Sequence, residues 1–182
     1  MTFRIREAVP SDVEAILSCM NEAYLVDAYW KKPDFHIRFT HAEIQAQLAD
    51  TVRGTFLVAE AMPSNVLCGS VYVQWESTTS GQEQSQRAGY FGTLAVLQAY
   101  EGQGIGSALI QAAENAMVER WGSIWMEIHV TNTRMELYGF YERKGYQPTD
   151  RKLDTDWFIA CLADEFLHVR PQVWRKWLQV AP

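Results

Sequence analysis

The sequence predicts an α+β or α/β domain of three layers, built on a mixed β-sheet. Strand-like and helix-like segments alternate along the chain in the order strand, two helices, three strands, helix, strand, helix and one or two strands. With 48% hydrophobic and 21% charged residues, the composition is that of an ordinary globular protein. A length of 182 residues fits a single domain spanning 1–182, and no internal repeat or boundary divides it.

The N-terminal part begins with a short strand and continues with two helices. Residues 3–6 alternate between apolar and polar side chains, as strands do. Ser11 precedes Glu14 by three residues, which is the spacing of a capping box. Thr40 and Glu43 repeat that spacing before a second helix. Behind the two boxes, apolar residues recur at helical intervals: Val13, Ile16, Leu17, Met20, Tyr24, Ile44 and Leu48.

Apolar segments of strand or helix character fill most of the remaining chain. The predicted strands are 56–59, 66–75, 90–96, 124–130, one that starts at Tyr146, and 173–178. The predicted helices are 105–117, stopped by Gly122, and 136–144, stopped by Gly145. The polar stretch 77–87 is expected to be a loop. The apolar stretch 154–168 fits no single class.

Charge and cysteine content exclude several kinds of protein. A formal charge of −6 disfavours a nucleic-acid binder, which usually carries a basic face. Three scattered cysteines, Cys19, Cys68 and Cys161, indicate neither a disulfide framework nor a metal site. The chain shows no signal peptide and no run of the roughly 20 apolar residues that cross a bilayer. A cytoplasmic protein without membrane contact is therefore expected.

The most informative local feature is a glycine-rich junction between a predicted strand and a predicted helix. Gly102, Gly104 and Gly106 lie directly before the helix. Glycines allow close approach of a ligand, and the free N–H groups and dipole of a helix N-terminus favour an anion, so a phosphate or pyrophosphate site is indicated. A tight turn that needs glycine for its geometry alone is the alternative. The dinucleotide fingerprint fails, because Ser107 or Leu109 stands where its last glycine or alanine belongs.

Two segments resemble GNAT-type N-acetyltransferases. The segment from Val96 to Leu109 resembles the family's coenzyme A signature, Arg/Gln-x-x-Gly-x-Gly/Ala. Glu101, Gly104 and Gly106 occupy its named positions, and Glu101 departs from the family at the first of them. Arg134 to Tyr146 resembles the family's closing motif, and the order of elements agrees from Phe3 to about Tyr146. The resemblance implies a mostly antiparallel sheet with splayed fourth and fifth strands, helices on both faces, and acetyl-CoA in the opening. The coenzyme contacts that it implies are Leu94, Ala95, Val96, Glu101, Gly102, Gln103, Gly104, Ile105, Gly106, Ser107, Arg134, Tyr138 and Tyr141.

The resemblance also implies direct attack of a neutral amine on the thioester, without a metal. Tyr141, four residues before Gly145, is the implied proton donor to the leaving thiolate, with Tyr138 as the alternative. The base is open: Glu127 and His129 share one face of their strand, His129 titrates in a useful range, and a water relay serves equally well. The expected acceptor pocket contains Tyr29, Trp30, His36 and Tyr90.

Several alternatives remain at this stage. The acceptor is a small-molecule amine or a protein or peptide amine. A catalytically silent coenzyme A-binding sensor would retain the glycine loop and need no proton donor. A nucleotide-binding oxidoreductase is disfavoured by the failed fingerprint. The tryptophan-rich C-terminal segment, with Trp157, Trp174 and Trp177, is a candidate homodimer surface.

Overall fold

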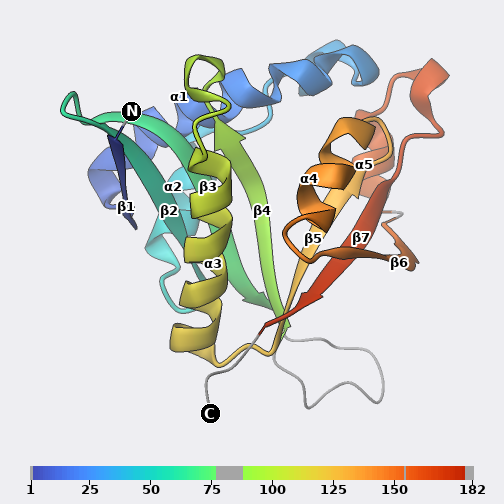
Figure 1. Cartoon of the computed structure of the whole chain (residues 1–182). Helices are drawn as coiled ribbons and strands as arrows, with labels where there is room; N and C mark the ends of the chain where they lie inside the picture. The colour runs from blue at the N-terminus through green and yellow to red at the C-terminus, as the bar shows by residue number, and fades with distance from the viewer. Residues whose placement is uncertain (1, 77–87, 154, 179–182) are drawn as a thin grey trace.

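A computed structural model describes residues 2–76, 88–153 and 155–178 of the chain. Within these residues, seven strands form one sheet in the order β1-β2-β3-β4-β5-β7-β6 (Figure 1). β4 and β5 are parallel and the other neighbours are antiparallel, which confirms the mixed, mostly antiparallel sheet. The expected loop 77–87 lies outside the described residues. The strands are β1 (Thr2–Glu7), β2 (Gly54–Met62), β3 (Val66–Glu76), β4 (Ala88–Val96), β5 (Trp125–Thr131), β6 (Gln147–Lys152) and β7 (Pro171–Trp177).

Helices cover both faces of the sheet, as expected. α3 and α4 lie on one face and α1 and α2 on the other (Figure 1). Among the described helices, none is both long and apolar enough to cross a membrane. The helices are α1 (Val13–Ala23), α2 (His41–Ala49), α3 (Ile105–Trp121), α4 (Tyr138–Glu142) and α5 (Asp156–Cys161).

One of the two predicted capping boxes is present. The Thr40 hydroxyl accepts the Glu43 N–H at 3.4 Å and the Glu43 carboxylate accepts the Thr40 N–H at 2.8 Å, so α2 begins as predicted. The box at Ser11 is wrong. A 3₁₀ turn at Pro10–Asp12 precedes α1, and the Asp12 carboxylate accepts the Val9 N–H at 2.7 Å. The Asp12 carboxylate therefore has the role that the predicted box assigned to Glu14, and it bonds to Val9 in place of Ser11.

The C-terminal third differs in detail from the prediction. A 3₁₀ turn at Met135–Leu137 leads into α4, so the helix predicted at 136–144 is shorter. Two strands follow, and the last begins at Pro171. The unassigned stretch 154–168 contains α5 and a 3₁₀ turn at Asp164–Phe166.

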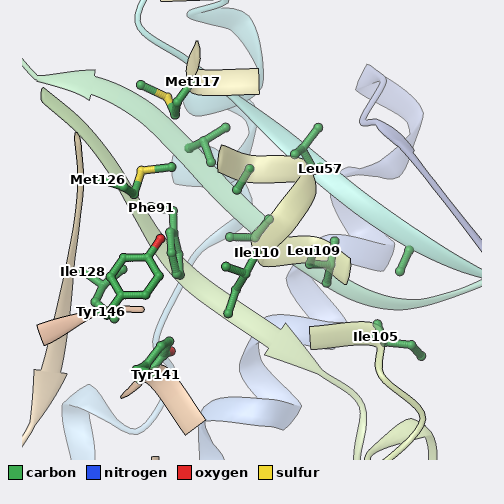
Figure 2. Close-up of a cluster of buried hydrophobic side chains, with 14 of the residues drawn as sticks. Leu57, Phe91, Ile105, Leu109, Ile110, Met117, Met126, Ile128, Tyr141 and Tyr146 are labelled. Atoms are coloured by element: carbon green, nitrogen blue, oxygen red, sulfur yellow. The ribbon is translucent and has the colours of Figure 1, made fainter. Parts of the chain in front are cut away.

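A large core between α3 and the sheet holds the two motifs together (Figure 2). Leu109 and Met117 of α3 are fully buried, and Phe91 of β4 lies beside them. The ring of Phe91 lies 6.5 Å from Tyr141 and 5.8 Å from Tyr146, measured between centroids. This contact joins β4 to the α4 segment, so the core fixes the position of the closing motif relative to the glycine loop.

β4 and β5 pair over three residues and then separate. Their register runs from Ala88 opposite Trp125 to Tyr90 opposite Glu127. Beyond these pairs the strands diverge, which confirms the expected splay (Figure 1). At the wide end, the chain after α1 reaches α5: Lys31 forms an antiparallel bridge with Leu162, and the Lys32 N–H donates to the Cys161 carbonyl at 2.9 Å. The two halves of the sheet are thus tied at both ends of the opening.

Candidate functional site

A cavity of about 1240 Å³ lies in the opening between β4 and β5, and is called the main cavity below. Its walls come from residues 22–27 and Trp30, from β4 and the glycine loop, from β5 and α4, and from parts of 153–171. The glycine signature, the closing motif and the aromatic segment after α1 therefore meet at one site.

The edge of β4 forms one wall. The β3–β4 register shifts between Ser70, opposite Ala95, and Tyr72, opposite Gly92, so β4 carries one extra residue there. Thr93, within this bulge, has φ of 55°, a conformation uncommon outside glycine. Past Tyr90, the side of β4 that faces β5 has no strand partner among the described residues, so its backbone can pair with an extended ligand. Of the three residues predicted to contact coenzyme here, Leu94 and Val96 line the main cavity, whereas Ala95 is buried in the core on the α1 face.

The glycine loop presents the N-terminus of α3 to the main cavity. Gly104 is the N-cap residue with φ of 84°, and Gly102 has φ of 72°, both in the left-handed region that favours glycine. A Cβ atom at either position would meet no protein atom within 4 Å, so protein packing does not demand glycine there. No side chain caps this helix end. The first-turn amides of residues 105–107 therefore retain their capacity to bind an anion in the main cavity.

Three predicted coenzyme contacts differ in their position. Glu101 is exposed and lies on the rim of the main cavity. Gln103 lies outside the cavity lining, and its side-chain amide donates to the Ala99 carbonyl at 3.5 Å. Arg134 lies on the wall, where its guanidinium donates to Glu136 at 2.5 Å and lies 3.5 Å from an Asp27 carboxylate oxygen.

Tyr141 lies on the wall of the main cavity and is 8% exposed. Burial raises the pKa of its hydroxyl well above the ordinary value, and neighbouring Tyr24 adds to the effect. The hydroxyl is therefore protonated at neutral pH and is available as a proton donor. Tyr138 lies against Trp174, with 4.9 Å between ring centroids, and is not part of the cavity lining.

The two candidate bases occupy different environments. Glu127 is buried and holds two arginines: Arg151 donates to its carboxylate at 2.9 Å and Arg175 at 2.6 Å. It does not line the main cavity. His129 does, and its ring lies 4.6 Å from that of Tyr90. Burial lowers the pKa of His129 to about 4, below the range in which the sequence predicts that it titrates.

The expected acceptor residues divide into two pairs. Trp30 and Tyr90 line the main cavity. Tyr29 is 57% exposed and packs against Phe166 at 5.5 Å, and His36 Nε2 lies 3.2 Å from the carbonyl oxygen of Lys31. Neither of these two residues contributes to the cavity lining.

Sequence reasoning placed Tyr24 in the acceptor pocket but missed Asp27, a further wall residue on the same face as Trp30. Tyr24, Asp27 and Trp30 belong to one 3₁₀ helix, Tyr24–Trp30, and all three line the main cavity. A 3₁₀ helix has three residues per turn, so the spacing of three places them in one row. Asp27 is 5% exposed and brings a carboxylate to the wall. Phe158 of α5 completes this side, with its ring 5.7 Å from that of Trp30.

Comparison with known proteins agrees with this geometry. A family model described as the acetyltransferase (GNAT) domain matches residues 52–148. A search of curated proteins by sequence finds no match.

Similar solved structures extend over nearly the whole chain. NAA60 of Arabidopsis thaliana, in complex with a bisubstrate analogue, is 16% identical with a TM-score of 0.74, over 99% of this chain and 100% of that one. The PaiA N-acetyltransferase of Thermoplasma acidophilum, in complex with coenzyme A, is 17% identical with a TM-score of 0.73, over 97% and 99%. YncA of Salmonella typhimurium, with its cofactor acetyl-CoA, is 17% identical with a TM-score of 0.70, over 100% and 96%.

At these identities the structural likeness shows a shared fold. The family model covers more than half of the 182 residues, including the glycine loop and the closing motif. The chain belongs to the GNAT family of acetyltransferases.

Proposed function

We propose that this protein is an N-acetyltransferase that transfers the acetyl group of acetyl-CoA directly to an amine within a ternary complex. The observation that carries the proposal is the make-up of the main cavity. One continuous surface combines an unpaired strand edge, an uncapped helix N-terminus and a buried, protonated tyrosine. These three features match three parts of a coenzyme A thioester. The strand edge suits the pantetheine arm, the helix N-terminus suits the pyrophosphate, and the tyrosine suits the departing sulfur.

The proposed coenzyme site follows the wall from the glycine loop to β4. The amides of residues 105–107 would bind the pyrophosphate, because they have no acceptor within the helix and lie at the positive end of its dipole. The backbones of Leu94 and Val96 would pair with the pantetheine arm as an added strand does. The coenzyme A and acetyl-CoA in the PaiA and YncA structures support this choice of cosubstrate.

The proposed chemistry is one addition and one elimination at the thioester carbonyl. The amine nitrogen forms the new C–N bond, and the C–S bond then breaks. Backbone N–H groups at the β4 bulge near Thr93 are the proposed donors to the carbonyl oxygen as it gains negative charge. The attacking nitrogen releases a proton to solvent as it becomes an amide, and Tyr141 gives its own proton to the leaving thiolate and regains one from solvent.

The amine must lose a proton before it attacks. Glu127 is committed to two arginines and His129 is a weak base in its buried position, so we propose that water carries this proton to solvent. Asp27 supplies a negative charge on the wall, and this charge attracts the ammonium form of the acceptor as it enters.

The test is release of free thiol from acetyl-CoA in the presence of a broad panel of amines. The panel contains small-molecule amines and peptides with free N-termini or lysines, because one fold can host several classes of acceptor. Amine-dependent thiol release with a matching acetylated product is expected. Tight binding of coenzyme A without thiol release from any amine would instead indicate a silent sensor.

A further inference from the structure

A second, smaller cavity of about 180 Å³ lies next to the main cavity, and is called the side cavity below. Trp30, Arg38 and Phe158 line both cavities, so these side chains separate the two spaces. Lys31, Ile37 and Cys161 are further members of the side cavity wall. A molecule that extends past the edge of Trp30 would occupy the main cavity and the side cavity together.

Lys31 brings a buried positive charge to the side cavity. The residue is 5% exposed, and among the described residues its Nζ has no hydrogen-bond partner. A buried ammonium is normally paired, because loss of its hydration is otherwise uncompensated. Burial lowers the pKa of Lys31 to about 8, and the charge of Arg38 contributes. At neutral pH the side chain is still mostly protonated.

Among the described residues, the wall of the side cavity holds two cationic side chains and one anionic side chain. Arg38 lies on the same wall as Lys31. Glu43 also lines it and adds one negative charge, although its carboxylate accepts hydrogen bonds from the N–H and hydroxyl of Thr40, both at 2.8 Å. Asp27 favours the charged form of Lys31 through its negative charge, but it lines the main cavity and lies 3.5 Å from Arg134. Burial raises the pKa of the Cys161 thiol, which is therefore uncharged.

The position of Lys31 is fixed by its backbone. The bridge to Leu162 and the hydrogen bond from the Lys32 N–H to the Cys161 carbonyl hold it against α5. Its ammonium also lies 4.7 Å from the ring centroid of Trp30. Trp30 also lines the side cavity, and among the described residues its Nε1 is a second buried donor without a hydrogen-bond acceptor. A ligand that provides acceptor oxygens would satisfy both donors.

We propose that the side cavity binds a carboxylate carried by the acceptor, so that the substrates are amines with a carboxylate group, such as amino acids and their derivatives. This inference rests on the proposed function. The carboxylate would lie beside Lys31 and the ammonium would lie on the other side of Trp30, toward Asp27. The apolar walls provided by Phe35, Ile37 and Phe158 suit a singly charged group with a few carbons. The carboxylate of Glu43 on the same wall disfavours a doubly charged phosphate.

The kinetic test uses matched acceptor pairs, namely amino acids and their carboxamides, with saturating acetyl-CoA. The wild-type protein should acetylate the carboxylate member with the higher kcat/KM. Lys31→Met should lower kcat/KM for that member by about 10- to 100-fold, the range expected when a charged hydrogen bond is lost, and leave the carboxamide within about twofold. Lys31→Arg should retain most of the preference. The absence of any carboxylate preference in the wild type would overturn the inference while leaving the acetyltransferase proposal intact.

The binding test needs no turnover. Benzoate and benzamide are titrated calorimetrically into the wild type, Lys31→Met and Lys32→Met. Lys32 is the matched control, because it is the neighbouring lysine, is exposed, and donates to the Ala160 carbonyl at 3.2 Å. Benzoate should bind the wild type and Lys32→Met but not Lys31→Met, and benzamide should bind none of them.

The two tests separate the two proposals. Benzoate binding that depends on Lys31, together with no thiol release from any amine, would support the carboxylate site and overturn the proposed function. Equal benzoate binding by the wild type and a folded Lys31→Met protein would overturn the carboxylate site. Thermal unfolding of each variant shows that it is folded before either result is read.

Discussion

Tyr141 combines two properties that a proton donor to a thiolate requires. The residue lines the main cavity, and burial holds the pKa of its hydroxyl above the ordinary value, so it carries a proton at neutral pH. The same core that buries the ring also fixes its position against Phe91 of β4. Because packing fixes the ring, the hydroxyl is held in one position, and a positioned general acid lowers the activation barrier of the step in which the thiolate leaves.

We predict that Tyr141→Phe lowers kcat by about a hundredfold, with little change in coenzyme A affinity. The ring and its packing remain, and the proton is lost. Tyr138→Phe is the matched control, since Tyr138 lies against Trp174 and outside the main cavity, and it should retain wild-type kcat. Steady-state rates are measured where chemistry limits turnover. Unchanged kcat in Tyr141→Phe would indicate that water, and not Tyr141, is the proton donor to the thiolate.

Lys31 should lower the stability of the free protein. Its folded pKa of about 8 lies below the ordinary 10.5, so the charged form is disfavoured by folding. We predict that Lys31→Met raises the free energy of unfolding at pH 7 by about 1–2 kcal/mol, after allowance for solvent screening. Between pH 8 and 10.5 the unfolded wild type binds more protons than the folded one, so wild-type stability rises with pH relative to the variant.

Urea unfolding of both proteins at pH 7 and pH 10 measures this difference. The difference in the free energy of unfolding between Lys31→Met and the wild type should be smaller at pH 10 than at pH 7. A gap that is independent of pH would show that Lys31 is charged and well solvated in the folded protein, contrary to the buried position of its ammonium.

At the scale of elements, the loop before α3 depends on two left-handed glycines. We predict that Gly104→Val abolishes coenzyme A binding, because the new side chain would enter the space where the phosphates would lie. Gly145→Val is the matched control: Gly145 has φ of 87°, and a Cβ there would lie 3.6 Å from the nearest atom of Lys176. Both substitutions should reduce stability by about 1–3 kcal/mol through backbone strain, and only the first should affect coenzyme.

Calorimetric titration with coenzyme A distinguishes the two variants at a temperature where both are folded. Normal affinity in Gly104→Val would contradict the placement of the phosphates at this helix end. Loss of affinity in Gly145→Val as well would point to a general folding defect.

The elements that the sequence predicted best have strong local signals. Periodic apolar residues identified α1 and α3, and the glycines located the junction before α3. The 3₁₀ helix Tyr24–Trp30 was not predicted. Its row of Tyr24, Asp27 and Trp30 follows a period of three residues, whereas the apolar pattern of an α-helix has a period of 3.6. α5 has six residues, too few to show a helical period, and its position depends on a bridge to Lys31 far along the chain.

Long-range pairing also explains why the base was difficult to assign. Glu127 and His129 are two residues apart on β5 and share one face of it, as predicted. The sequence does not show that Arg151 of β6 and Arg175 of β7 approach Glu127. These contacts depend on the strand order β5-β7-β6, in which the last two strands exchange places. Burial of His129, which lowers its pKa, is likewise a property of the assembled cavity.

At the scale of the whole molecule, the main cavity separates two halves of one sheet. β1 to β4 form one half and β5 to β7 the other, and they share three register pairs at the narrow end. The core in Figure 2 and the bridge at Lys31 provide further links. A ligand in the proposed position would touch β4 and the glycine loop on one side and α4 on the other, and would therefore join the halves directly.

We predict that coenzyme A stabilises the entire fold, by about 2.7 kcal/mol at a hundred times its dissociation constant. Binding to the folded state alone shifts the unfolding equilibrium by mass action, and the ligand would be lost when the two halves separate. Chemical unfolding with and without coenzyme A measures the shift, and NAD at the same concentration is the control. Hydrogen exchange should also slow at the amides of Lys32 and Ala163, which tie the 3₁₀ helix to α5. Stabilisation by NAD, or none by coenzyme A, would contradict the assignment of the main cavity to coenzyme A.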